Sequence, residues 1–196
     1  MRALNNNPFR VLGTISNASL RELKSAEVLI KRYLDINEPP ILKFDLTPPM
    51  DSINRTIDDI VKAKNQIHNS KDKLIHSFFW FISSGPIDNI ALNKLTESKN
   101  IEEALETFRK GSKSFKISEK TATCILNHSS LELLQYKIHS DEAKLIESLK
   151  RKIELLSDES IVKYFEFLIT GEKNKVKYLE IKDGVFDKIK SILLEL

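Results

Sequence analysis

The sequence predicts an all-α protein, and three observations support this prediction. First, the 196 residues include only 5 glycines and 6 prolines, the residues that most often interrupt helices. Second, apolar residues recur every three or four positions along most of the chain, which is the spacing of one buried helix face. Third, serine, asparagine and aspartate, which cap helix N-termini, precede several of these runs. A content of 41% hydrophobic and 30% charged residues is typical of a globular chain.

Capping signals predict the first two helices. Pro8 fits the first turn of a short helix, where its missing N–H is not needed, and Gly13 ends that helix. Ser19 and Glu22 have the spacing of a capping box, which predicts a second helix over about 19–35. Apolar residues at helical intervals predict its buried stripe: Leu20, Leu23, Ala26, Ile30, Tyr33 and Leu34.

Four prolines predict an extended loop over 36–51: Pro39, Pro40, Pro48 and Pro49. Proline fixes its own φ and also moves the preceding residue out of the helical region. This loop is longer than most connections between helices, and long ordered loops often carry function. Phe44 and Asp45 in its middle are therefore candidate partner-binding residues.

Two further helices complete the first half. Asp51 or Ser52 is predicted to cap a third helix, with these residues on one buried face: Ile53, Ile57, Ile60, Val61 and Ile67. A fourth helix is expected to contain the aromatic run 78–81, Phe-Phe-Trp-Phe, which would cover most of its circumference. We expect this helix to be buried and to be the place where the second half docks. The alternative is an exposed aromatic binding patch.

Ser-Ser-Gly-Pro at 83–86 predicts a boundary between two units, 1–83 and 84–196. The second unit should consist of short helices separated by polar turns, with breaks near Ser129 or Ser130 and again at Asp183 and Gly184. The apolar final segment, 186–196, is expected to pack back onto the body, to pair with another chain in an oligomer, or to precede further polypeptide.

The sequence contains no recognisable catalytic motif. It lacks a phosphate-binding loop, a nucleophile elbow and a zinc-protease helix. Cys124 and His128 share a helix face, but no nearby residues complete the set of about four ligands that a structural metal needs. We therefore expect a buried cysteine, a surface histidine, no metal, no cofactor and no small-molecule substrate, so the protein is predicted not to be an enzyme.

Composition also restricts location and partners. One cysteine cannot form an internal disulfide, the start of the chain has no signal-peptide pattern, and no apolar run approaches the roughly 20 residues of a membrane span. These features predict a cytoplasmic protein with no membrane contact. A net charge of +3 is small for a dedicated nucleic-acid binder, so nucleic acid is a less favoured partner than protein.

Three segments together resemble the J-domain, a small helical co-chaperone module. They are Asn-Pro-Phe-Arg-Val-Leu-Gly at 7–13, Asn-Ala-Ser-Leu-Arg-Glu-Leu at 17–23, and the segment 71–81. The resemblance implies a helical hairpin whose second helix presents a basic face, here Lys24, Lys31 and Arg32, to an ATPase chaperone. The His-Pro-Asp signal of that family is missing, because the first 67 residues contain no histidine. Stimulation of the ATPase is therefore expected to be absent.

The segment 95–110 looks like the middle of a tetratricopeptide helical hairpin, although no second copy follows about 34 residues later. The leading hypothesis is a non-enzymatic scaffold or adaptor: a degenerate J-domain-like module followed by a tetratricopeptide-like domain that binds proteins. One alternative is a functional co-chaperone that recruits an ATPase chaperone or its clients through the basic face. Another is a nucleic-acid-binding protein that uses a basic segment: Arg109, Lys110, Lys113, Lys116 and Lys120.

Overall fold

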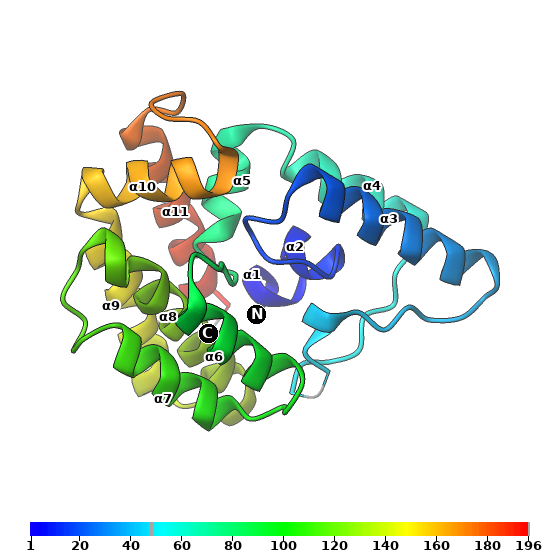
Figure 1. Cartoon of the computed structure of the whole chain (residues 1–196), viewed down its shortest axis with the longest axis horizontal. Coiled ribbons are helices and arrows are strands. Elements are labelled where there is room, and N and C mark those ends of the chain that lie inside the picture. The colour runs from blue at the N-terminus through cyan, green and yellow to red at the C-terminus, as the bar shows by residue number, and fades with distance from the viewer. Residues whose placement is uncertain (48, 196) are drawn as a thin grey trace.

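The computed structural model describes residues 1–47 and 49–195, and these residues form eleven α-helices, one 3-10 turn and no strand (Figure 1). The all-α prediction is confirmed. Pro48 and Leu196, predicted to lie in the extended loop and in the final apolar segment, lie outside the described residues. The helices are α1 (Arg2–Asn5), α2 (Pro8–Val11), α3 (Leu20–Asp35), α4 (Ile57–Gln66), α5 (Ser70–Ser77), α6 (Pro86–Thr96), α7 (Ile101–Gly111), α8 (Glu119–His139), α9 (Glu142–Leu156), α10 (Glu159–Thr170) and α11 (Tyr178–Leu193), and the 3-10 turn is η1 (Lys43–Asp45).

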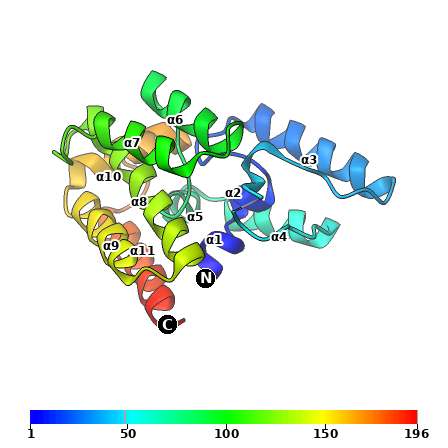
Figure 2. The ribbon, with the colours of Figure 1, turned by 90° about the horizontal axis from the view of Figure 1, so that it is seen from below.

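Helices α3 and α4 form an arm that extends away from the other helices (Figures 1 and 2). The predicted capping box is confirmed, since the Ser19 hydroxyl accepts from the Glu22 N–H at 3.2 Å and the Glu22 carboxylate accepts from the Ser19 N–H at 2.7 Å. The predicted buried stripe is wrong for most of its length. Only Ile30 is fully buried in α3, and Leu20 is 84% exposed. Because the arm extends beyond the body, few side chains cover this helix.

Helix α4 begins later than predicted. It is capped by Thr56, whose hydroxyl accepts from the Asp59 N–H at 3.2 Å, rather than by Asp51 or Ser52. The extension to 51 fails because Arg55 turns inward and is buried, which holds the residues before Thr56 in the loop. Of the predicted stripe, Ile60 and Ile67 are buried, Ile53 is half-buried, and Ile57 and Val61 are exposed.

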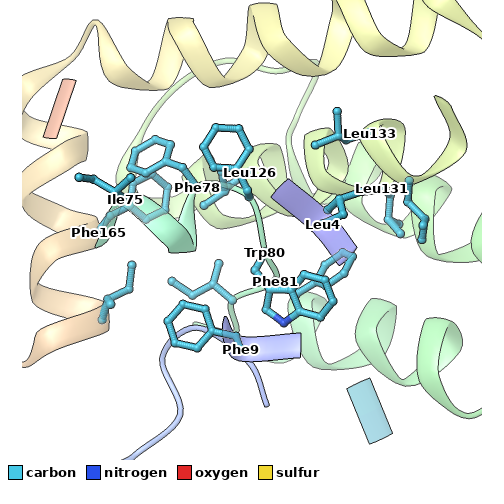
Figure 3. Close-up of a cluster of buried hydrophobic side chains, with 14 of the residues drawn as sticks. Leu4, Phe9, Ile75, Phe78, Trp80, Phe81, Leu126, Leu131, Leu133 and Phe165 are labelled. Atoms are coloured by element: carbon cyan, nitrogen blue, oxygen red, sulfur yellow. The ribbon is translucent and has the colours of Figure 1, made fainter. Parts of the chain in front are cut away.

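The aromatic run is buried but is not helical, which corrects the prediction of a fourth helix through it. Helix α5 ends at Ser77, and the chain then turns and becomes extended. Phe78, Phe79 and Trp80 are fully buried and Phe81 is 1% exposed, so the alternative of an exposed aromatic patch is wrong. Figure 3 shows Phe78 beside Leu126 of α8 and Phe165 of α10, and Trp80 and Phe81 together near Phe9 of the first half.

Hydrogen bonds from the first half fix one side of this extended segment. The Trp80 indole N–H donates to the Thr14 carbonyl at 2.8 Å, and the Ser16 N–H donates to the Phe81 carbonyl at 2.8 Å. Backbone groups in a buried segment need such partners, since leaving them unsatisfied is costly.

Helix α8 fixes the other side. The Asn127 side chain accepts from the Ile82 N–H at 2.9 Å and donates to the Ile82 carbonyl at 2.8 Å, and both residues are fully buried. The aromatic segment is therefore where the two halves of the chain meet, and one continuous hydrophobic cluster extends from Leu4 to Ile192.

The second half contains longer helices than predicted. The expected break at Ser129 or Ser130 is wrong, because α8 continues through both residues and is buried from 121 to 135. The Ser129 hydroxyl bonds back to the Leu126 carbonyl at 2.7 Å, which lets a serine sit inside the helix.

The break expected at Asp183 and Gly184 is also wrong, since α11 passes through both residues. A Cβ at Gly184 would lie 2.3 Å from the Ile75 side chain, so this glycine lets α11 approach α5 closely. Gly171 ends α10 with φ of 76°, a left-handed conformation that glycine adopts readily. Within the described residues, no helix is both long and apolar enough to cross a bilayer.

Candidate protein-binding groove

The loop between α3 and α4 is fixed by buried charges. The Arg55 guanidinium forms an ion pair with the Asp45 carboxylate, which also accepts from the Leu42 N–H at 3.0 Å. The same guanidinium donates to the carbonyls of Val11 at 2.7 Å and Arg10 at 3.1 Å, which connects the loop to α2. A buried ion pair with its remaining donors satisfied holds one arrangement of the backbone.

Arg10 completes this arrangement. Its guanidinium donates from Nε to the Asp45 carbonyl at 3.2 Å and from NH1 to the Asn5 carbonyl at 3.2 Å. Burial lowers the pKa of Arg10 to about 10, and the nearby Asp45 charge partly opposes this shift. Arg10 therefore stays charged at neutral pH, and the loop is a fixed element rather than a free chain.

The two loop residues predicted to bind a partner are both drawn inward. Asp45 is 7% exposed and engaged by Arg55, while Phe44 is half-buried against the hydrophobic cluster. Their neighbour Lys43 contacts the second half instead, with Nζ at 2.9 Å from Asn93 Oδ1 and 3.1 Å from Glu97 Oε1. Phe44 and Asp45 therefore attach the loop to the body of the protein.

A groove of about 630 Å³ lies along the side of α3 that faces the body. Its walls come from α3, from the α4–α5 connection and from the end of α10. The lining residues are Leu12, Leu20, Leu23, Lys24, Glu27, Lys64, Ile67, His68, Ser70, Lys73, Thr170 and Glu172. The groove thus combines segments that are far apart in the sequence.

Ion pairs leave part of the positive charge of the groove uncompensated. Glu27 bonds to both Lys31 at 2.8 Å and Lys64 at 2.7 Å, and these contacts lower its pKa. Lys24 and Lys73 form no ion pair with any described residue. The Lys73 ammonium donates only to the Ile169 carbonyl at 2.7 Å, and burial lowers its pKa. Two lysines beside an apolar floor can therefore form ion pairs with carboxylate groups of a bound partner.

The three predicted basic residues of the second helix do not form one face. Lys24 and Lys31 are seven residues apart and lie on one stripe of α3, because a helix has 3.6 residues per turn. Arg32 is about a quarter of a turn away, on the exposed side together with Val28, which is 42% exposed. Of the predicted set, only Lys24 lines the groove.

The basic segment 109–120 is also divided. Arg109 bonds to Glu106 through Nε at 2.7 Å, and Lys110 lies 3.5 Å from the same carboxylate, which lowers the pKa of Glu106 to about 2. Lys113, Lys116 and Lys120 form no ion pair within the described part of the chain. Two of the five predicted nucleic-acid contacts are therefore neutralised locally.

The aromatic residue of that segment is occupied within the protein. The Arg151 guanidinium lies 4.0 Å from the centre of the Phe115 ring, and the His128 ring meets it edge to face at 5.0 Å. His128 is 7% exposed, so the prediction of a surface histidine is wrong. Phe115 is therefore already stacked on side chains of α8 and α9, rather than presenting a free platform for bases.

Cys124 is a buried structural residue. It is 4% exposed, its thiol lies 3.5 Å from Asp88 Oδ1, and burial with the nearby Asp88 charge raises its pKa to about 12. A thiol with a raised pKa is a poor nucleophile at neutral pH. Across the described residues, no three or more His, Cys, Asp and Glu side chains gather as a metal site.

Sequence reasoning missed the residues that organise these surfaces. No sequence pattern indicates a special role for Arg10, Arg55, Asn127 or Lys152. Lys152 is fully buried in α9, with Nζ at 2.6 Å from the Ser129 hydroxyl of α8. Its spacing, three residues after Leu149 and four before Leu156, is the only signal in the sequence that places it on the apolar face, and lysines are usually exposed.

Comparison with protein-family models, with curated proteins and with solved structures finds no match for this chain.

Proposed function

We propose that this chain is a non-enzymatic, cytoplasmic interaction module that binds an acidic, amphipathic segment of another protein along the groove beside α3. The observation that supports this proposal is the exposure of α3 itself. Its sixteen residues bury only Ile30 completely, and they leave Leu20, Val28 and Leu29 at 84%, 42% and 43% exposure.

A helix exposed in this way gains little from tertiary packing. Isolated helices of about 12–15 residues are marginal in water, and most helices in proteins are stabilised by burying an apolar face. The capping box at Ser19 and the bridge from Glu27 to Lys64 hold α3 in place, but they leave three of its apolar side chains exposed: Leu20, Val28 and Leu29. Of these exposed side chains, Leu20 lines the groove, and apolar side chains exposed beside a groove mark interaction sites in soluble proteins.

The groove indicates the chemistry of the partner. Leu20 and Leu23 offer apolar contact, while Lys24 and Lys73 offer positive charge without an ion-pair partner among the described residues. A segment with leucine-like side chains on one face and carboxylates beside them satisfies both features. Helix-in-groove recognition of amphipathic segments works in this way.

The J-domain resemblance supports this proposal as a scaffold without the ATPase-stimulating signal of that family. Because the His-Pro-Asp signal is missing and the loop is held by Arg55 and Asp45, we expect no stimulation of an ATPase chaperone. The tetratricopeptide-like second half, which begins with the α6 and α7 pair, would provide the rigid body behind the arm. A saturable increase in ATP turnover would favour the co-chaperone alternative instead.

Fluorescence anisotropy with two synthetic peptides tests the groove. One peptide carries leucines at helical spacing with glutamates between them, and the other replaces each glutamate by lysine. We expect the acidic peptide to bind more tightly. Leu23→Asp and Lys24→Glu should each weaken it by about tenfold or more, since removing an apolar anchor or a charge-assisted contact costs about 1.5 kcal/mol or more.

Lys150→Glu is the matched control, because Lys150 is exposed on α9, far from the groove in sequence and on another helix. It makes the same charge change and should leave binding as in the wild type. Equal affinity for both peptides, or a Lys24→Glu chain that binds as well as Lys150→Glu, would contradict the proposal.

A further inference from the structure

A second, smaller pocket of about 170 Å³ lies where α1, the end of α4, α5 and α11 meet. Figure 1 shows α1, α5 and α11 gathered near the middle of the molecule, away from the outer part of the arm. Eight residues line the pocket: Arg2, Ala3, Asn6, Asn7, Gln66, His76, Lys188 and Ser191. It shares none of its lining residues with the groove beside α3.

The lining of this pocket is rich in hydrogen-bond donors and includes no carboxylate. It carries the guanidinium of Arg2, the ammonium of Lys188, the imidazole of His76 and the amide of Gln66. None of these four side chains forms an ion pair or a hydrogen bond with another residue that the structure describes. In most proteins a half-buried lysine has a counter-charge within reach, so the missing partner at Lys188 needs an explanation.

The pKa shifts of Lys188 and His76 indicate that little negative charge reaches this pocket. Burial lowers the pKa of Lys188, and the Asp72 carboxylate, which lies beyond ion-pair distance, offsets this only in part. Burial and the nearby Lys188 charge lower the pKa of His76 to about 4, again partly opposed by Asp72. His76 is therefore neutral at physiological pH, and Arg2 and Lys188 are the cations of the pocket.

The walls of the pocket are held by the fold. The Asn7 side chain donates to the carbonyls of His76 at 3.1 Å and Phe79 at 3.4 Å, which fixes the floor against the end of α5. Gly184 lets α11 pack directly on Ile75 of α5, which positions Lys188 one turn further along. The backbone segments that carry these donors are therefore fixed before binding, so only the donor side chains lose conformational freedom when a ligand binds.

We propose that this pocket binds a small tetrahedral oxyanion of the phosphate class, with Arg2 and Lys188 as the charged contacts and Gln66 and His76 as further donors. Several acceptor oxygens on one compact anion match several donors that converge from different elements. Guanidinium and ammonium groups are the usual protein partners of phosphate. The proposal does not depend on the binding of a peptide by the groove.

Proton NMR titration of the His76 ring tests this proposal in the full chain. Inorganic phosphate and methyl phosphate are added separately, with sodium chloride at matched ionic strength as the reference. We expect a saturable shift of the His76 resonances with phosphate. The pKa of His76 should rise by about one unit, because a bound anion favours the imidazolium form. Saturation by inorganic phosphate alone would indicate the free ion, and saturation by both would indicate a phosphate monoester group.

Two variants and one control complete the experiment. Lys188→Gln and Arg2→Gln should each weaken phosphate binding by about tenfold or more, since each removes a charged hydrogen bond. Lys190→Gln, an exposed position two residues away on α11, should bind phosphate as the wild type does. A shift that does not saturate, that sodium chloride reproduces, or that Lys188→Gln leaves unchanged would overturn the proposal. Far-UV circular dichroism checks that each variant is folded.

Discussion

Helices α3 and α8 show how differently two helices of one chain can be used. Helix α8 is buried along its length from 121 to 135, including polar residues such as Asn127, Ser129 and Ser130. Helix α3 has a clear amphipathic sequence but buries only Ile30. An apolar stripe in the sequence therefore shows that a helix face can be buried, and the elements packed around the helix determine whether it is buried.

The contrast predicts that α8 and its partners carry most of the stability. Trp80→Ala removes a fully buried indole packed beside α8 and its hydrogen bond to Thr14, and should lower the free energy of unfolding by about 3–5 kcal/mol. Leu20→Ala in the arm should change it by less than about 0.5 kcal/mol. Urea unfolding followed by far-UV circular dichroism measures both. A loss of several kcal/mol in the free energy of unfolding of Leu20→Ala would show that α3 contributes as much stability as α8.

The base of the arm should be more sensitive than its exposed helix. Arg55→Ala leaves the Asp45 carboxylate buried without its partner and should destabilise the protein by about 3 kcal/mol. Amide hydrogen exchange over 36–56 should increase as well. Arg32→Ala provides the control, since Arg32 is exposed on α3 and pairs with no acid among the described residues. If both variants exchange alike, the ion pair does not hold the loop.

Lys152 makes the body sensitive to pH. Burial lowers its pKa from 10.5 to about 7, with the Glu132 charge opposing this in part. Between these two values the unfolded chain binds one more proton than the folded chain. This group therefore makes the free energy of unfolding rise with pH from about 7 to 10, by up to about 4 kcal/mol.

Lys152→Met should remove that pH dependence. At pH 7 the variant should be more stable than the wild type by about 1 kcal/mol, because a buried apolar side chain needs no desolvation of charge. This advantage should reverse toward pH 10, where the wild-type lysine is neutral when folded and also bonds to Ser129, so that the variant is then less stable than the wild type by about 3 kcal/mol. Urea titrations of both proteins at several pH values check this, and parallel curves would rule out Lys152 as the cause.

The smallest effect is expected at the basic segment 109–120. Two of its five cations pair with Glu106, and Phe115 is stacked within the protein, so we expect no retarded band with single-stranded RNA at physiological salt. A retarded band that weakens steeply with salt, and that disappears in Lys113→Gln/Lys116→Gln/Lys120→Gln, would support the nucleic-acid alternative.

Local chemistry accounts for what could be predicted. The capping box at Ser19 and the proline at the start of α2 both appear where the sequence predicts them. Each depends on hydrogen bonds or backbone angles within one turn of the chain, so neighbouring residues are enough to predict it.

The misplaced elements depend on contacts from elsewhere in the chain. The sequence predicts a helix through the run 78–81, but Thr14 bonds to Trp80, Ser16 bonds to Phe81, and Asn127 bonds to Ile82 directly after the run. These contacts hold the segment after α5 in a turn and an extended stretch. The candidate groove could be predicted only through Lys24, since its other walls come from α4, α5 and α10. No local pattern indicates that these segments meet.

Residues within a few positions of one another are enough to predict that this protein is helical and where several helices begin and end, because those features depend on capping, spacing and backbone angles. Local patterns do not predict which apolar stripe is covered, which polar residues are buried, or which cations lack an acidic partner. Those outcomes depend on the distances between elements far apart in the chain, and burial and charge compensation both follow from such distances.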